Sequence, residues 1–227
     1  MQYSWDFSIV WDNRATLASG LLVSMGLTAF CILVGTALAI PVALLLARPS
    51  DAVQRTVNAL VEVVRALPIL VLLIWVYYVM PNLIGISLSA FWTAAWVLAI
   101  NLAAFAADIL RGGITAIPHE HIEAGLALGM DKSLVRRRVI VPETFRRCIP
   151  ALTALYITMF KFSTLASVIS VWELLHAGDA IIINTYKPLE VYTAIAVMYL
   201  VVIVPTTYAA KRLEQIPQFA VQPGRPA

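Results

Sequence analysis

The sequence is poor in charged residues, because Asp, Glu, Lys and Arg together make up 13% of its 227 positions. Soluble domains carry charges at about a quarter of their positions, so this chain lacks the polar surface that a globular protein presents to water. Hydrophobic residues supply 61% of the chain, and the mean hydropathy is +0.85. The composition therefore indicates an integral membrane protein.

Cysteine is also scarce, and the residue types of metal and catalytic sites are not clustered. Cys31 lies inside an apolar run and Cys148 at a basic boundary, which argues against a structural disulfide between them. His119 and His121 lack the i, i+4 spacing of a helical zinc site, and His176 is far from them in the chain. We expect no metal, no cofactor and no catalytic centre.

A nucleotide-binding P-loop is missing as well. Such a loop contains Gly-Lys, because its backbone N–H groups and its lysine hold the phosphates. The four lysines are Lys132, Lys161, Lys187 and Lys211, and none follows a glycine. The chain is therefore not expected to bind and hydrolyse a nucleotide at a P-loop of its own.

Five apolar runs are long enough to cross a bilayer, which takes about 20 mostly apolar helical residues. They lie at 18–47, 57–80, 89–110, 149–172 and 190–210. These runs predict an all-α membrane protein whose five transmembrane helices form one bundle. The start of the chain has neither the basic residues nor the cleavage site of a secretory signal, so we expect the first span to direct insertion.

The basic residues are distributed unevenly along the chain. Twelve of the sixteen Lys and Arg residues lie between spans one and two, between spans three and four, or after span five. Short loops rich in Lys and Arg remain in the cytoplasm, so the N-terminus is expected outside and the C-terminus inside. The same distribution explains a pI near 9.0 without a nucleic-acid partner.

A charged, glycine-punctuated stretch at 118–150 interrupts the apolar pattern on the predicted cytoplasmic side. Pro118 suits the first turn of a helix, and the good helix formers that follow run to Gly129, which can end a helix in the left-handed conformation. Small side chains occur at Ala124, Gly125 and Ala127, and apolar ones at Ile122, Leu126 and Leu128. A helix this short is unstable alone, so we expect it to dock on another protein.

A second helix is predicted directly after the first. Asp131 can cap it, and we expect Pro142 to end it and Pro150 to begin the fourth span. Its arginines are Arg136, Arg137 and Arg138. They can contact a protein partner or anionic lipid headgroups, and the sequence leaves both interpretations open.

The stretch EAGLALGMDKSLVRRRVIVPETFRRCIP resembles the EAA loop of ABC importer permeases. The family pattern of Glu-Ala-Ala, a later Gly and a downstream Pro falls here on Glu123, Ala124, Gly125, Gly129 and Pro142. The stretches VRALPILVLLIWVYYVMP, AADILRGGITAIP, MFKFSTLASVISVWELLHAGDAI and TYKPLEVYTAIAVMYL resemble the second to fifth spans of polar amino acid permeases, in that order. The resemblance covers the chain from about Thr16 to Glu214.

The chain departs from the family pattern at three places. Gly125 replaces the second Ala of the EAA motif, and Phe162 replaces a polar or acidic residue after the lysine of span four. Val141-Pro142-Glu143-Thr144 stands where Leu-Pro-Gln-Ala is usual. Glycine at position 125 is expected to cost the helix about 0.5–1 kcal/mol relative to alanine.

The resemblance implies a type I ABC importer permease bundle with a cytoplasmic coupling helix, in a bacterial inner membrane. It divides the chain into an external, interfacial segment at 1–17, a transmembrane domain at 18–214 with its EAA loop at about 113–148, and a cytoplasmic tail at 215–227. The coupling residues it implies are Glu123, Ala124, Gly125, Ala127, Leu128 and Gly129. Spacing alone favours a solvated charge on an exposed helix as the interpretation of Glu123, and only the resemblance favours an interface role.

The implied partners are a second permease subunit, of the same or a related chain, two ATPase subunits that bind ATP and Mg, and an external solute-binding protein. Two ATPases would close on nucleotide and drive alternating access in the permeases. The alternatives are a permease for an opine, a compatible solute or a modified amino acid, and, from another class, a stand-alone channel or secondary carrier.

Polar residues within the spans are candidates for the translocation path, because a charge in a membrane helix normally faces a partner or a wet cavity. The candidates are Lys161, Asn101, Glu62, Arg65, Ser163 and Thr164. Lys161 could attract a substrate carboxylate, or it could make a structural contact. Glu62 and Arg65 are three residues apart and are expected to pair with each other. The same spacing predicts a pair between Asp108 and Arg111.

Overall fold

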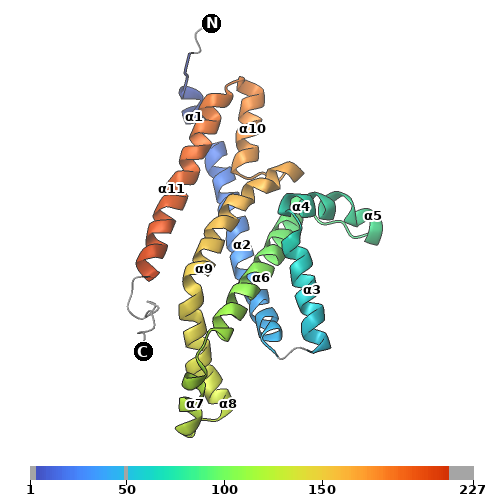
Figure 1. Ribbon diagram of the computed structural model, residues 1–227. Helices are drawn as coiled ribbons and strands as arrows, with labels where there is room; N and C mark the ends of the chain where they lie inside the picture. Colours follow the sequence, from blue (N-terminus) through green and yellow to red (C-terminus); the bar gives the residue numbers. More distant parts are fainter. Residues whose placement is uncertain (1–3, 49–50, 215–227) are drawn as a thin grey trace.

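The computed structural model describes residues 4–48 and 51–214, and within these ranges the chain is helical and contains no β-strand (Figure 1). In chain order the helices are α1 (Ser8–Asp12), α2 (Arg14–Leu46), α3 (Ala52–Ala66), α4 (Ile69–Tyr78), α5 (Met80–Ile84), α6 (Ala90–Thr115), α7 (His119–Ala127), α8 (Lys132–Val135), α9 (Val141–Phe162), α10 (Leu174–Thr185) and α11 (Pro188–Glu214). A π-helical segment, η1 (Arg136–Ile140), joins α8 to α9, and a 3-10 segment, η2 (Ser163–Ile169), follows α9. The predicted all-α fold is confirmed.

Four helical runs are long and apolar enough to span a membrane: α2, α6, the run from α8 through η2, and α11. The remaining predicted span, 57–80, is divided into α3 and α4, which are bent by 98° relative to each other. Leu67 between them is extended, the conformation that the ring of Pro68 favours in the preceding residue. The chain has five spans if α3 and α4 together make one.

Pro142 and Pro150 do not have the boundary roles predicted for them. The helical run from Lys132 to Phe162 passes through both residues without interruption. Pro142 lies in the first turn of α9, directly after the π-helical segment, where its missing N–H group is tolerated. Pro150 lies inside α9. Helix α9 therefore extends as one element from the predicted loop into the predicted fourth span.

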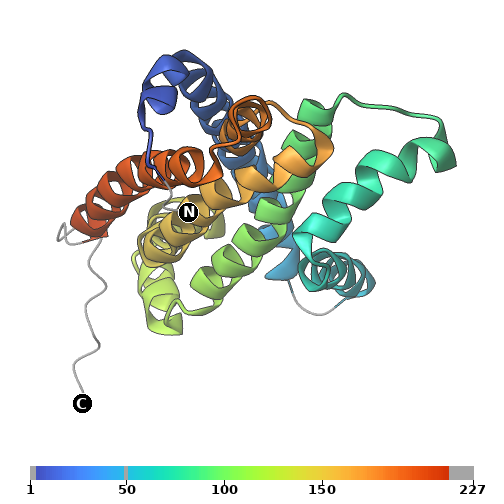
Figure 2. The same cartoon turned by 90° about the horizontal axis from the view of Figure 1, so that it is seen from above.

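Helix α6 lies at the centre of the bundle and packs most extensively against α2 and next against α9 (Figure 1, Figure 2). Its apolar stretch is 72% buried, whereas that of α11 is 17% buried. The fully buried alanines of α6 are Ala94, Ala95, Ala99, Ala106 and Ala107. Small side chains let membrane helices approach closely, so α6 can contact several neighbours at once.

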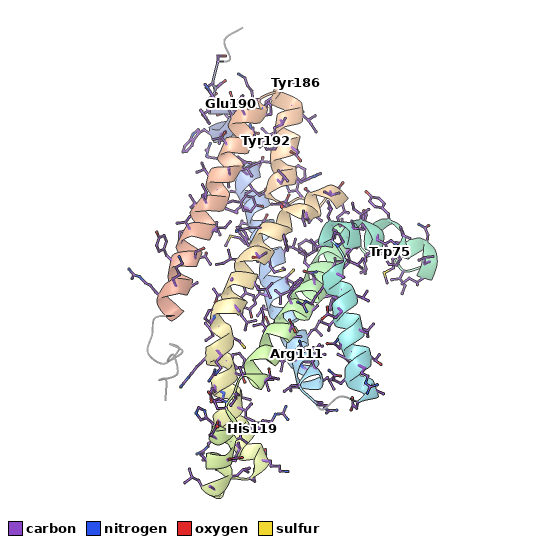
Figure 3. The ribbon with its side chains drawn as sticks, viewed as in Figure 1. Trp75, Arg111, His119, Tyr186, Glu190 and Tyr192 are labelled. Carbon is purple, nitrogen blue, oxygen red and sulfur yellow. The ribbon has the colours of Figure 1, made fainter. Side chains whose placement is uncertain are left out.

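The two ends of the bundle carry different elements. Figure 1 shows α7, α8 and the first turns of α9 at one end, which we call the loop end. Helices α1 and α10 and the start of α11 lie at the opposite end. In Figure 3, Arg111 and His119 lie toward the loop end, and Tyr186 and Glu190 lie at the opposite end. Because α2 ends and α3 begins toward the loop end as well, the basic connections after spans one and three lie at the same end of the bundle.

Helix α10 packs against α2 at a position where α2 has a glycine. A Cβ atom on Gly20 would lie 2.8 Å from Ala177 Cβ and 2.9 Å from Leu174 Cα. Gly26, two turns further along α2, has no atom within 4 Å of the position that its Cβ would occupy. The close approach of α10 therefore requires glycine at position 20 but not at position 26.

Substituting these two glycines separates packing from helix propensity. We expect Gly20→Ala to lower the free energy of unfolding by about 1–3 kcal/mol, because the added methyl group overpacks the contact with α10. The matched control, Gly26→Ala, is expected to be neutral or to stabilise α2 by up to about 1 kcal/mol. Thermal unfolding of the purified transporter in detergent measures both, and equal midpoints for the two variants would contradict the role of Gly20.

Candidate functional site

Helix α7, at the tip of the loop end, has defined boundaries. Pro118 is its N-cap, and Gly129 follows its last turn with a φ of +81°, the left-handed conformation predicted for this glycine. The Gly129 amide donates a hydrogen bond to the Leu126 carbonyl at 2.9 Å. Asp131 caps α8 as predicted, because its carboxylate accepts a hydrogen bond from the Leu134 amide at 2.8 Å. The loop is therefore a compact helical hairpin.

Two contacts hold α7 against the helices that follow it, one between His121 and Glu143 of α9 and one between Gly125 and Val135 of α8. His121 Nδ1 lies 2.9 Å from Glu143 Oε2, and Arg147 donates a hydrogen bond to Glu143 Oε1 at 2.7 Å. Gly125 is buried, and a Cβ atom there would approach Val135 Cγ2 to 3.1 Å. Glycine at 125 and glutamate at 143, two of the departures from the family pattern in this loop, therefore both contribute to seating α7 on α8 and α9.

The remaining surface of α7 is open. Glu123, Ala124 and Ala127 are exposed, and the Leu128 side chain at the end of the helix is 78% exposed. Leu126 is also exposed, at 42%. Large apolar side chains at the tip of a hairpin, next to a carboxylate, form a surface suited to contact with another protein. Gly125 alone among the predicted coupling residues faces inward.

Three candidate path residues lie together where α9 passes into η2. Ser163 is buried and its hydroxyl donates to the Phe160 carbonyl at 2.8 Å, while the Thr164 hydroxyl donates to the Lys161 carbonyl at 2.8 Å. The Lys161 side chain is exposed at the surface of the single subunit. The two hydroxyl groups therefore bond to the local backbone, and the ammonium group is available to a partner or to a substrate.

Asn101 occupies a different position, in the buried centre of α6. It is 2% exposed, and its Oδ1 atom has no hydrogen-bond partner among the described residues. A buried polar atom without a partner costs about 1–3 kcal/mol. This side chain thus marks a point in the bundle where a further polar group, such as water or a substrate, would be stabilised.

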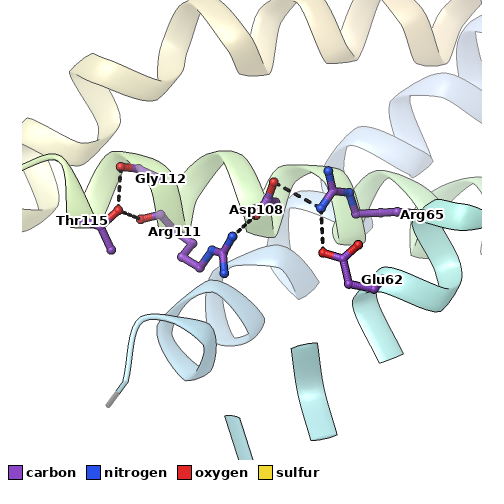
Figure 4. Close-up of polar contacts among 6 residues, drawn as sticks. All are labelled: Glu62, Arg65, Asp108, Arg111, Gly112 and Thr115. Carbon is purple, nitrogen blue, oxygen red and sulfur yellow. Dashed lines mark hydrogen bonds and ion pairs between the residues drawn. The ribbon is translucent and has the colours of Figure 1, made fainter. Parts of the chain in front are cut away.

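Four charged residues form a chain of ion pairs between α3 and α6 (Figure 4). Arg65 lies 3.3 Å from Glu62 and 3.3 Å from Asp108, and Arg111 lies 2.7 Å from Asp108. Both pairs predicted from the spacing are thus present. The link between Arg65 and Asp108 joins two helices and was not predicted, because spacing along one helix carries no information about contacts between helices. Arg65 also lies over the ring of Phe105, 5.2 Å from its centroid.

A buried carboxylate that the sequence analysis did not consider lies between η2 and α10. Glu173 is fully buried, and it caps α10 by accepting a hydrogen bond from the His176 amide at 2.9 Å. Its other oxygen accepts hydrogen bonds from Ser24 and Tyr199, each at 3.3 Å. Glu173 thus connects α2, α10 and α11. The signal in the sequence was an acidic residue in an otherwise apolar stretch between two predicted spans.

The predicted external segment, of which residues 4–17 are described, is held at the opposite end. Glu190 is fully buried and accepts a hydrogen bond from the Asp6 amide at 2.9 Å, and Lys187 lies 3.7 Å from the same carboxylate. Lys187 also donates to the Ser4 carbonyl at 3.0 Å. Hydrogen bonds from the hydroxyl and amide of Ser8 lower the pKa of the Asp6 carboxyl. These contacts fasten the N-terminal segment to the start of α11.

The cysteines have packing roles in this arrangement. Cys31 and Cys148 are buried free thiols. Cys31 Sγ lies 3.6 Å from the Ala95 carbonyl, and Cys148 Sγ lies 3.3 Å from the Ile109 carbonyl, so both contact α6. Across residues 4–48 and 51–214, no group of three or more His, Cys, Asp or Glu side chains is arranged to hold a metal ion.

Residues 39–216 match the family described as "Binding-protein-dependent transport system inner membrane component". The chain is 30% identical to the octopine transport system permease protein OccM of Rhizobium meliloti, over 97% of this chain and 92% of that protein. It is 29% identical to the glutamine transport system permease protein GlnP of Escherichia coli K12, over 95% and 98% of the two chains. A solved amino acid ABC transporter with histidines shares 30% identity and a TM-score of 0.87, covering 94% of this chain and 99% of that one.

The ion pairs between α3 and α6 are expected to contribute to the free energy of unfolding, and two substitutions test this. Asp108→Asn leaves both arginines without their shared carboxylate, and we expect a loss of about 1 kcal/mol, limited because the groups are partly solvated. Glu62→Gln, at the more exposed end of the chain of pairs, is the control and should change stability by less than about 0.5 kcal/mol. Denaturant or thermal unfolding of the purified transporter compares them. A larger effect of Glu62→Gln would show that Asp108 is not the central group.

Proposed function

This chain belongs to the family of binding-protein-dependent transport system inner membrane components and is a membrane-spanning permease subunit of an ABC importer, and we propose that its substrate is a polar amino acid or a closely related compound. The names of its glutamine and octopine relatives support this substrate class. An opine or another modified amino acid is the alternative within the same class, favoured by the octopine relative. Binding assays with the external solute-binding protein would distinguish these substrates.

The exposed surface of α7 is the observation that carries the proposed mechanism. We propose that Glu123, Ala124, Ala127 and Leu128 contact an ATPase subunit, with Leu128 as the apolar anchor. Gly125 and Gly129 would act indirectly, since Gly125 permits the close contact with Val135 and Gly129 provides the left-handed turn that ends the helix. The contact of His121 with Glu143, whose other oxygen is held by Arg147 of the same helix α9, supports a rigid seating of α7 on α9.

ABC importers of this family work with an ATPase and an external binding protein. We propose an assembly of two permease subunits, of the same or related chains, with two ATPases that bind ATP and Mg. Closure of the ATPases on nucleotide would move the two α7 helices together and switch the path between inward-open and outward-open states. The permease itself is a transport subunit and not an enzyme.

The chain is a multi-pass protein of the inner membrane. We propose that the loop end faces the cytoplasm and that the N-terminus lies outside, because the basic connections lie at the loop end and basic loops remain in the cytoplasm. The predicted tail at 215–227 lies outside the described residues. The surrounding lipids are the remaining partners, and no nucleic acid is expected.

For the translocation path, we propose Lys161 and Asn101 as the principal polar groups. Lys161 could attract a substrate carboxylate, and its exposure on the single subunit supports contact with a shared path. The unpartnered Oδ1 of Asn101 supports a polar occupant near α6. Ser163 and Thr164 would fix the backbone at the end of α9, next to Lys161. Glu62 and Arg65 are engaged in ion pairs, which favours a structural link over contact with substrate.

A stand-alone channel or secondary carrier is the interpretation from another class. It would leave the exposed apolar surface of α7 without a partner, and it would need no ATPase. Family membership and the seated, outward-facing α7 together favour the ATP-driven importer.

Charge reversal and loss of the apolar anchor test the coupling proposal. We expect Glu123→Lys and Leu128→Asp each to reduce co-purification of the ATPase at least about tenfold, equivalent to about 1.4 kcal/mol of binding free energy. Asp12→Lys, a charge reversal at an exposed position of the opposite end, is the matched control and should leave the ATPase bound. Membrane insertion is checked for all three. Normal association of both loop variants would contradict α7 as the coupling element, and uptake without any ATPase would favour the carrier.

A further inference from the structure

An apolar groove opens between α2, α6 and α9 toward the loop end. Its volume is about 220 Å³, and apolar side chains from all three helices line most of it. The side chains that define its walls are Ile40 and Leu44 of α2, Leu110 and Ile114 of α6, and Val141 and Phe145 of α9. Pockets for whole small molecules are larger, about 300–1,000 Å³, so the groove fits part of a ligand that continues outside it.

The groove faces outward from the bundle and not into its core. Ile40, Leu44, Val141 and Phe145 are between 36% and 43% exposed. They belong to helical runs that are long and apolar enough to span a membrane, so the groove borders lipid or its interface wherever no partner subunit covers it. An acyl chain is the apolar group that is always present there.

The groove also contains one polar group without a partner. Thr144 is 4% exposed, and its hydroxyl makes no hydrogen bond among the described residues. Further along the same helix, the Thr153 hydroxyl donates to the Ile149 carbonyl at 2.7 Å and the Thr158 hydroxyl to the Ala154 carbonyl at 2.9 Å. Thr144 makes no bond of this kind at the start of α9, directly after the π-helical segment. Thr144 is one of the lining residues, and its hydroxyl would be stabilised by an acceptor that it reaches when the side chain turns toward the groove.

One cationic side chain also lines the groove. Arg136 lines it from η1, and its side chain is exposed and makes no ion pair within the part of the chain that the structure describes. Arg137 and Arg138 are also exposed but do not line the groove. An apolar groove with an arginine at its rim and a free hydroxyl donor matches a phospholipid, which has an acyl chain, ester oxygens and a phosphate. Basic pockets between membrane helices bind anionic headgroups in the same way.

We propose that this groove is a binding site for an anionic phospholipid. One acyl chain lies against Leu44 and Ile114, the phosphate pairs with Arg136, and an oxygen of the lipid accepts a hydrogen bond from Thr144. The lipid covers the junction of α2, α6 and α9 beside the helical hairpin. The site is independent of the transported substrate.

Native mass spectrometry of the importer purified with its ATPase subunits tests the site, with phosphatidylglycerol and phosphatidylcholine of identical acyl chains as probes. We expect phosphatidylglycerol to bind more tightly, and Arg136→Gln to weaken its binding about fivefold, the equivalent of about 1 kcal/mol per basic side chain. Arg137→Gln and Arg138→Gln are the matched controls and should lose less. Leu44→Trp, which fills the groove, should weaken both lipids, whereas Leu33→Trp, on the exposed face of α2 outside the groove, should weaken neither.

The outcomes distinguish a specific lipid-binding groove from non-specific attraction of anionic lipid to the basic surface. Equal losses for the three arginine variants would overturn the site, because they would indicate attraction by charge alone. Equal affinities for the two lipids would overturn the role of Arg136. Unchanged binding in Leu44→Trp, or no lipid bound to the assembled importer, would overturn the groove as the location.

Discussion

The contact between α6 and α2 is the interaction on which the rest of the subunit depends. In lipid the hydrophobic effect does little to hold helices together, so close packing of small residues must do so. A Cβ atom on Gly35 of α2 would lie 2.7 Å from the Ala99 carbonyl of α6, which shows how near the two backbones come. With α6 held in this way, α4, α3 and α9 all pack on it, and Asp108 adds an ionic link to α3.

Helix α9 connects the two regions to which function is assigned. Its first turns carry Glu143, which holds α7 through His121, and its last turn carries Lys161. No break separates them, because Pro142 lies in the first turn and the helix continues through Pro150. A displacement of α7 would therefore move a continuous helix that reaches the candidate path. The groove beside Thr144 lies where lipid can contact the first turns of this helix.

Much of this architecture could be predicted from residues that act locally. Hydropathy indicated the spans, Gly129 the end of α7 and Asp131 the cap of α8, because each depends on the conformation of a few consecutive residues. Spacing along a helix was enough to predict the pairs of Glu62 with Arg65 and of Asp108 with Arg111. The roles of Pro142 and Pro150 were predicted wrongly, because tertiary packing and the preceding π-helical segment accommodate both within one helix.

The sequence by itself determined the membrane environment, the helical class, the helical hairpin between two spans and the family, since composition, periodicity and motif order are properties of the chain. Only the tertiary structure decided which side chains meet across helices. Glu173 is stabilised by Ser24 and Tyr199, and Glu190 by the Asp6 amide, from segments far apart in sequence. Gly20, Arg65 and Thr144 likewise acquire their roles from neighbouring helices. These contacts depend on distances between helices, which no pattern within a single helix specifies.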